Sequence, residues 1–288
     1  MSDAIKRYQV PFNKKFSIAA AATKPEKNQD KDDLKKQLKS LVKEFADLQE
    51  VLYAQDQYAV LLVFQAMDAA GKDGTISAVL SGVNPAGTQV VSFKQPSAEE
   101  LDHDFLWRTA KNLPERGRIG VFNRSYYEEV LVVRVHPEYL AGQHLPPDVD
   151  LKTIWQERYE SIRDHEKHLA RNGVVILKFW LNVSKEEQKK RFLARLDEPE
   201  KNWKFSAGDV AERQHWDQYM EAYEEALKET SREHAPWYAI PADDKDYMRV
   251  QVAQIIVDTL TSLKLKYPTV SDKERAQFAE ARRLLESE

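Results

Sequence analysis

Short apolar runs alternate along this chain with longer segments in which apolar side chains recur at helical spacing. That spacing predicts one helix from Asp32 to Gln55. A loop ending at Pro146-Pro147 and a closing Gly173 delimit another helix from Asp150 to Arg171. The apolar runs are rich in Val, Ile and aromatic residues, and they predict strands at Tyr58–Phe64, Thr88–Phe93, Ile119–Asn123, Val174–Leu181 and Trp237–Ile240. Strands of this kind, separated by helices, favour an α/β fold with a parallel sheet covered on both faces.

The same pattern predicts one domain over residues 1–288, with attached segments. Residues 1–31 are polar and basic, and we expect them to form an arm that lies across the surface. Residues 265–288 predict a C-terminal helix, and residues from about 184 to 215 predict a helix-loop-helix hairpin. Three helix starts carry the pattern of a capping box, namely Ser184 with Glu187, Asp209 with Glu212, and Ser271 with Glu274.

Composition narrows the class of protein. The chain has 288 residues, a net charge of −4 and a pI near 6.1, so neither nucleic acid nor a membrane is an expected partner. The absence of cysteine excludes disulfides, thiolate metal sites and cysteine nucleophiles. The N-terminus does not resemble a signal peptide, and no apolar run approaches a membrane span. We therefore expect a cytoplasmic enzyme.

The most informative stretch, residues 65–75, lies between the first predicted strand and the next helix. A Gly71-Lys72 turn in this position presents backbone N–H groups and a helix N-terminus to phosphate oxygens. The usual phosphate-loop pattern is altered at Ala66, which replaces its first glycine, and at Asp73, which replaces its magnesium-binding hydroxyl residue. The candidate phosphate-binding residues are Ala69, Ala70, Gly71, Lys72, Asp73, Gly74 and Thr75.

Two charged residues of this loop are candidates for chemistry. Lys72 would supply positive charge where negative charge moves during phosphoryl transfer, although a solvated lysine at a helix start is the simpler alternative. Asp68 would repel phosphate unless a divalent cation lay between them, which favours a ligand to Mg²⁺, or to Mn²⁺ in its place. A turn-forming aspartate is the alternative. Asn123, at the end of the third strand, is the second candidate metal residue because it could support a metal-bound water.

Arg124 follows Asn123 at a strand's carboxyl end, where ligands bind in open α/β sheets. Its guanidinium can grip a phosphate with two parallel hydrogen bonds. A purely structural ion pair with Glu128 is the alternative. We count both Arg124 and Glu128 among the candidate catalytic and nucleotide-binding residues, together with Asp68 and Lys72 as catalytic residues.

A second basic cluster lies in the predicted hairpin. Arg191 and Arg195 are four residues apart and therefore share one helix face. With Lys204 in the loop and Arg213 beyond it, they suggest a lid that closes over a phosphate chain and excludes water. A charged, solvated helix pair is the alternative, because acidic residues are also abundant there.

Three residues after the second strand are candidates for holding the acceptor. Lys94 and Arg108 could bind an acceptor phosphate, and Phe105 could stack on a base. Core packing of the aromatic residues around Phe105 explains the same pattern, and the residues alone do not decide between the two interpretations.

Taken together, these motifs resemble the second family of polyphosphate kinases, phosphate-loop enzymes similar to thymidylate kinase. The matching stretches are Met67–Gly74, Phe122–Glu128, Lys178–Leu181, Lys190–Phe192, Trp203–Ser206 and Ile240–Lys245. The stretches occur in this order along the chain and span roughly residues 35–265.

The resemblance implies a three-layer α/β/α fold with a helical lid and magnesium-dependent phosphoryl transfer between inorganic polyphosphate and a nucleotide. It assigns magnesium to Asp68, phosphate to Lys72, the transferring group to Arg124, and the phosphate chain to Arg191, Arg195 and Lys204. The Asn123–Glu128 version of the motif resembles the class that acts on both AMP and ADP. The family also implies a homo-oligomer, either a dimer or a tetramer. An ATP-dependent nucleotide kinase and a non-catalytic phosphate sensor are the alternative functions.

Overall fold

The computed structural model describes residues 3–13 and 15–288, and its centre is a parallel sheet of five strands. The strands are β1 (Ala59–Gln65), β2 (Thr88–Ser92), β3 (Ile119–Asn123), β4 (Val174–Asn182) and β5 (Trp237–Pro241). They lie in the order β2-β3-β1-β4-β5. All five predicted strands are therefore present at nearly the predicted bounds, and the predicted α/β fold with a parallel sheet is confirmed.

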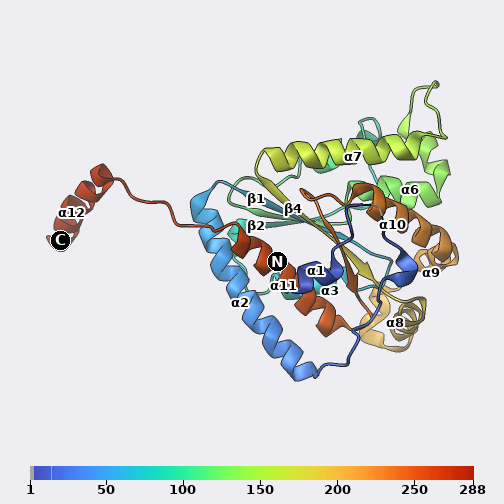
Figure 1. The fold of residues 1–288 in the computed structure, drawn as a ribbon, viewed down its shortest axis with the longest axis horizontal. Helices are drawn as coiled ribbons and strands as arrows, with labels where there is room; N and C mark the ends of the chain where they lie inside the picture. The colour runs from blue at the N-terminus through green and yellow to red at the C-terminus, as the bar shows by residue number, and fades with distance from the viewer. Residues whose placement is uncertain (1–2, 14) are drawn as a thin grey trace.

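Helices cover both faces of this sheet (Figure 1). One layer contains α2 (Lys31–Gln55), α3 (Lys72–Val79) and α11 (Lys245–Ser262), and α11 contacts both of the others. The other contains α6 (Val132–Val135), α7 (Ile154–Arg171) and α10 (Trp216–Thr230). Because both faces are covered, every residue of β1 is buried, as its unbroken apolar sequence predicts.

Shorter elements connect these layers. After β2 come α4 (Ala98–Leu101) and α5 (Trp107–Ala110), and after β3 come the 3₁₀ helices η3 (Tyr126–Val130) and η4 (Pro137–Gln143). The hairpin predicted near residues 184–215 contains α8 (Lys185–Asp197), η5 (Pro199–Lys204), α9 (Ala207–Glu212) and η6 (Arg213–His215). It lies at the edge of the molecule, beside the carboxyl end of the sheet (Figure 1).

The N-terminal segment is better packed than an arm on the surface. Helix α1 (Asp3–Tyr8) buries Ile5 and Tyr8, and the main chain of Val10 donates a hydrogen bond of 2.8 Å to the Trp237 carbonyl of β5. The apolar side chains of residues 4–10 dock on the body, whereas most of the described residues from 11 to 31 are exposed, as expected of a surface arm. Residues 1–2 and 14 of the predicted arm lie outside the described residues.

Two predicted helix starts were wrong. The helix expected from Asp150 begins at Ile154, since residues 150–153 form turns. Asp209 lies inside α9, whose N-cap is Ser206, and its carboxylate is bound by Arg195 instead of capping a helix. At the other two starts, the side chains of Ser184 and Ser271 accept hydrogen bonds from the third residue of α8 and of α12 (Asp272–Glu286). Only Ser271 forms the full capping box with its glutamate, because the main chain of Ser184 donates to Asp243 instead.

Candidate active site

The candidate site lies where the strand order reverses. β1 pairs with β3 on one side and with β4 on the other, and the chain leaves β1 and β3 at the same edge of the sheet. Ligands of open α/β sheets bind outside the carboxyl ends of the strands at such a reversal. The loop after β1 and the turn after β3 are the two segments in which the sequence indicated chemistry.

The loop after β1 adopts a conformation that only certain residues tolerate. Gly71 has φ +108°, and a side chain there would be strained and would press on Met248 at 3.2 Å. Ala69 also has a positive φ, of +61°. Gly71 is the N-cap of α3, and the Thr75 hydroxyl donates to its carbonyl at 2.9 Å, so the helix begins directly behind the turn. The predicted phosphate-binding residues 69–75 therefore form one turn and one helix start.

Lys72 is the first residue of α3, and its side chain folds back over the loop. Its ammonium group donates to the carbonyl of Ala66 at 3.0 Å. Burial lowers the pKa of Lys72, and the nearby positive charge of Arg124 lowers it further. An anionic ligand would stabilise the charged form of Lys72, because its negative charge would offset both the burial and the repulsion by Arg124.

Arg124 links the loop after β1 to the turn after β3. Its Nη2 donates to Asp68 Oδ1 at 2.9 Å, and its Nη1 donates to Glu128 Oε2 at 3.1 Å. These carboxylates raise the pKa of Arg124, with Glu128 as the larger cause. The side chain remains 38% exposed, so the guanidinium is positioned by protein groups and still accessible to a ligand. Arg124 can therefore form the ion pair with Glu128 and still bind a phosphate, so the two interpretations of this residue are compatible.

The two candidate metal residues provide oxygen ligands of the kind that suits Mg²⁺. Asp68 is a half-buried carboxylate at the mouth of the loop, and Asn123 donates its amide to Asp73 Oδ1 at 2.6 Å. Among the described residues, no three His, Asp or Glu side chains form a metal-binding group. Mg²⁺ is commonly held by one or two carboxylates plus substrate phosphates, so one loop carboxylate fits that ion.

Helix α8 of the hairpin supports the loop from the outside. Arg191, only 8% exposed, donates to the carbonyls of Ala69 at 3.0 Å and Ala70 at 2.8 Å. Its other terminal nitrogen donates to the carbonyls of Ala242 and Asp243. The structure therefore binds this guanidinium to backbone carbonyls, and a contact of Arg191 with the phosphate chain stays a prediction.

Gln188, one turn earlier on α8, was not predicted. Its amide donates to the carbonyl of Asp68 at 2.9 Å, and its oxygen accepts from Arg213 at 2.7 Å. Arg213 also donates to the carbonyl of Lys185 at 2.7 Å. Arg213, a candidate phosphate-binding residue, thus forms its hydrogen bonds within the hairpin, as Arg191 does with the loop. Gln188 and Arg191 are three residues apart and therefore lie on one helix face. This spacing was the sequence pattern that could have identified Gln188 as a site residue.

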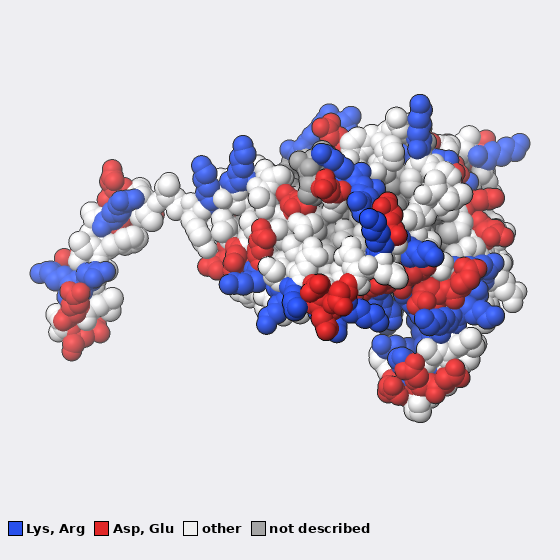
Figure 2. Space-filling model, turned by 60° about the horizontal axis from the view of Figure 1, so that its bottom comes forward, with Lys and Arg blue, Asp and Glu red and all other residues white. Residues whose placement is uncertain are grey.

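The remaining hairpin cations lie further out. Arg195 donates to Asp209 at 3.0 Å and to the carbonyl of Lys204 at 3.1 Å, and Lys204 lies over the ring of the exposed Trp203. The pKa of Asp209 is raised by burial and by the charge of Asp68, so α9 approaches the loop. On the face shown in Figure 2, acidic and basic side chains are interspersed.

The three candidate acceptor residues are only partly brought together. Phe105 and Arg108 line a pocket of about 240 Å³, whereas the side chain of Lys94 is exposed and its carbonyl accepts from Arg108 at 2.6 Å. The pocket also contains the buried ion pair of Arg158 and Glu129, at 3.1 Å, which the sequence did not reveal. Glu129 belongs to η3, the segment that follows the Arg124 turn, so one element contributes to both places.

Comparison with known proteins agrees with this geometry. Residues 28–268 match the model of the family described as Polyphosphate kinase 2 (PPK2). The chain is 55% identical over 282 residues to an ADP-polyphosphate phosphotransferase of Rhodopseudomonas palustris, covering 97% of this chain and 98% of that one. It is 51% identical over 229 residues to an AMP/ADP-polyphosphate phosphotransferase of Meiothermus ruber, covering 78% and 82%.

A solved structure is similar over almost the whole length. The crystal structure of polyphosphate kinase 2 from Arthrobacter aurescens has a TM-score of 0.87 and 41% sequence identity, and the alignment covers 97% of each chain. The resemblance that the motifs suggested is thereby confirmed, and with it an enzyme of the kinase class. This chain belongs to the polyphosphate kinase 2 family.

Proposed function

We propose that this enzyme transfers a phosphoryl group from inorganic polyphosphate to ADP and AMP, with Mg²⁺ as its metal. The activities for which its relatives are named support polyphosphate as one substrate and adenosine nucleotides as the other. The observation that carries the proposal is the fork of Arg124 between Asp68 and Glu128, which brings the ends of two strands together beside Lys72.

The chemistry that this site must perform is mainly electrostatic. The terminal phosphate of a nucleotide is already anionic at neutral pH, so the reaction needs no general base to create a nucleophile. The protein must instead hold two polyanions in line and neutralise the charge that moves between them. Lys72 and the turn of Gly71 would hold the donor phosphates, and Arg124 would contact the transferring group. Mg²⁺ held by Asp68, when bound, would supply further positive charge at the phosphates.

The nucleoside end of the acceptor is assigned to the pocket lined by Phe105 and Arg108. It shares η3 with the Arg124 turn through Glu129 and offers an aromatic surface with buried polar groups, which is the usual composition of a small-molecule pocket. Arg195 and Lys204 would accompany the rest of the phosphate chain, whereas Arg191 would support the loop. Because the acceptors are metabolic nucleotides, we expect the enzyme to work in the cytoplasm.

The direct test supplies purified enzyme with Mg²⁺ and polyphosphate, and then with ADP or AMP in turn, with no other phosphoryl donor. We expect ATP from ADP, and ADP followed by ATP from AMP. Chelation of the metal should reduce turnover to background, and added Mg²⁺ should restore it. Product nucleotides are separated and quantified by chromatography.

Two results would point elsewhere. Transfer that requires ATP as donor would support a nucleotide kinase, and binding of polyphosphate without turnover would support a sensor. Turnover unaffected by chelation would contradict the metal assignment of Asp68 while leaving the substrates intact.

We also propose that the enzyme is a homo-oligomer assembled through its C-terminal helix. Helix α12 stands clear of the body in both overall views (Figures 1 and 2), and all of its residues are exposed. An isolated helix of 15 residues is marginal in water, and this one exposes Phe278, Leu284 and Leu285. A second copy of the chain is the partner that would cover this apolar face.

Replacing Phe278 and Leu285 together by serine is expected to lower the solution mass to that of a smaller species, because both lie on one face of α12, seven residues apart. Light scattering after size-exclusion chromatography measures the mass. The matched control is the Glu280→Ser/Arg283→Ser variant, which changes two residues elsewhere on the helix that pair with each other. An unchanged mass in the first variant would contradict an interface at α12.

A further inference from the structure

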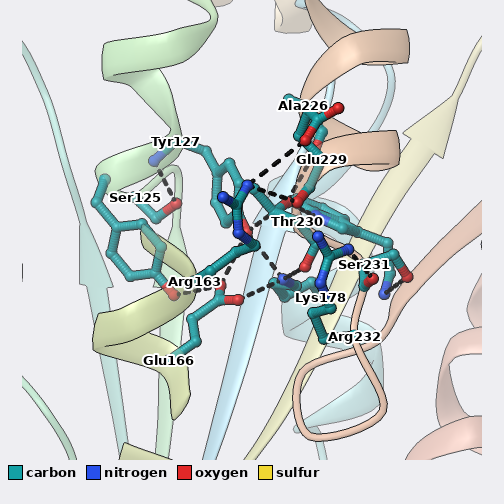
Figure 3. A network of polar contacts seen from close by, with 12 residues as sticks. Ser125, Tyr127, Arg163, Glu166, Lys178, Ala226, Glu229, Thr230, Ser231 and Arg232 are labelled. Carbon is teal, nitrogen blue, oxygen red and sulfur yellow. Dashed lines mark hydrogen bonds and ion pairs between the residues drawn. The ribbon is translucent and has the colours of Figure 1, made fainter. Parts of the chain in front are cut away.

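A buried polar network lies directly behind the turn that carries Arg124 (Figure 3). Lys178 of β4 donates to Glu166 of α7 at 2.7 Å, to the Tyr127 hydroxyl at 2.8 Å and to the Thr230 carbonyl at 2.9 Å. All three donors of the ammonium group are thereby used. The side chains of Lys178 and Glu166 are 0% exposed.

Glu166 extends this network to the turn itself. Its Oε1 accepts from the hydroxyl of Tyr126 at 3.0 Å and from that of Tyr127 at 2.8 Å. Both tyrosines belong to η3, which begins two residues after Arg124, and both rings are buried. The Tyr127 hydroxyl also lies 2.8 Å from Thr230 Oγ1, at the end of α10. Figure 3 shows η3, α7, β4 and the end of α10 meeting at this point.

Stability alone is a weak explanation for this network. Burial lowers the pKa of Lys178 and raises the pKa of Glu166, so the surroundings oppose both charges. Apolar side chains of similar volume frequently give an equally stable or more stable core than a buried ion pair. The buried pair of Lys178 and Glu166 is better explained by a local backbone geometry that it holds in place.

The turn after β3 is the geometry that needs fixing. Arg124 has φ +64°, a left-handed conformation that a residue with a side chain adopts only when its surroundings enforce it. The next residue, Ser125, accepts hydrogen bonds of 3.2 Å from Gln65 at the end of β1 and from the main chain of Tyr127. The tyrosine hydroxyls anchor the far side of the same turn, so the backbone of residues 124–128 is held at both ends.

We propose that Tyr127, Glu166 and Lys178 are positioning residues that hold the 124–128 turn so that Arg124 and Glu128 face the phosphate chain. This inference rests on the proposed phosphotransfer at that site. All three side chains are fully buried, so their effect on the reaction would pass through the backbone of the turn.

The Tyr127→Phe variant tests the proposal, because it keeps the ring in the core and removes only the hydroxyl. We expect kcat to fall about tenfold or more, since a small displacement of a catalytic group is costly. KM for polyphosphate should change less than about twofold. A role confined to stability would reduce the amount of folded enzyme and leave kcat per folded molecule unchanged. The control is Tyr8→Phe, which removes a buried hydroxyl hydrogen bond to Tyr247 away from this turn.

A double-mutant cycle with Arg124→Lys shows whether the effect passes through the turn. We expect Tyr127→Phe to reduce kcat little further in the Arg124→Lys background; fully multiplicative effects would overturn the proposal. Wild-type kcat in folded Tyr127→Phe would also overturn it, whereas a wild-type enzyme that does not transfer phosphate would instead contradict the proposed function. Should Tyr127→Phe not fold, Glu166→Gln takes its place, because it keeps the side-chain shape and removes the carboxylate that holds both tyrosines.

Discussion

Replacing Lys72 by alanine is expected to lower the turnover of phosphoryl transfer roughly a hundredfold or more, the usual effect of losing a charge-stabilising group. The side chain folds over the loop after β1 and is the loop's own cation. Without it, the loop has no side-chain cation of its own, and the negative charge that moves between the two substrates is neutralised only by Arg124 and by the Mg²⁺ that Asp68 would hold. Initial rates at saturating polyphosphate and ADP measure the loss.

The fold should tolerate this change. The Lys72 ammonium makes one hydrogen bond to the protein, to the Ala66 carbonyl, and alanine is compatible with the first turn of a helix. Thermal unfolding should therefore shift little. The matched control is Lys31→Ala, which removes the lysine at the first position of α2, far along the chain from the site. Near-normal turnover in Lys72→Ala would mean that the loop does not hold the donor phosphates.

The sequence was a good guide to this loop because its signal is local. A buried strand, a Gly-Lys turn and a helix start lie within a few consecutive residues, and the chain order alone places them in contact. The turn after β3 was recognised for the same reason, since Asn123 and Arg124 end an apolar run. Parallel strands deliver their carboxyl ends to one edge, so the meeting of these two segments also followed from the fold class.

Roles that depend on distant partners were not accessible in this way. Arg191 was correctly placed on a helix beside other cations, but its hydrogen-bond partners are carbonyls more than a hundred positions earlier and about fifty later. Lys178 appears in the sequence as one polar residue in an apolar strand, and its partner Glu166 appears as part of a charged helix face. Only the packing of α7 on β4 shows that the two form a buried pair.

Asp209 shows how a local pattern can mislead. An aspartate three residues before Glu212 satisfies the pattern of a capping box, yet α9 begins earlier, at Ala207. Tertiary contacts decide the outcome, because Arg195 of α8 binds the carboxylate at 3.0 Å. The same contact joins α8 to α9, so the residue that the pattern assigned to a helix start links two helices of the hairpin instead.

The Arg124→Lys variant is expected to lower turnover by about tenfold to a hundredfold, because a lysine keeps the charge but loses the planar fork. Two charge-assisted hydrogen bonds from one guanidinium now connect Asp68 and Glu128. An ammonium group can reach one of these carboxylates or the substrate, and each such bond is worth about 1.5–3 kcal/mol. Initial rates and KM for both substrates measure the effect.

Arg118→Lys is the matched control, because Arg118 immediately precedes β3 at its opposite end and forms an exposed pair with Glu115. That change should leave turnover unaltered, since exposed pairs contribute little. A retained rate in Arg124→Lys would mean that the fork is purely structural, and unfolding curves would then have to show its contribution. A loss confined to kcat would instead place Arg124 against the transferring group, whereas a rise confined to KM would place it on the bound substrate alone.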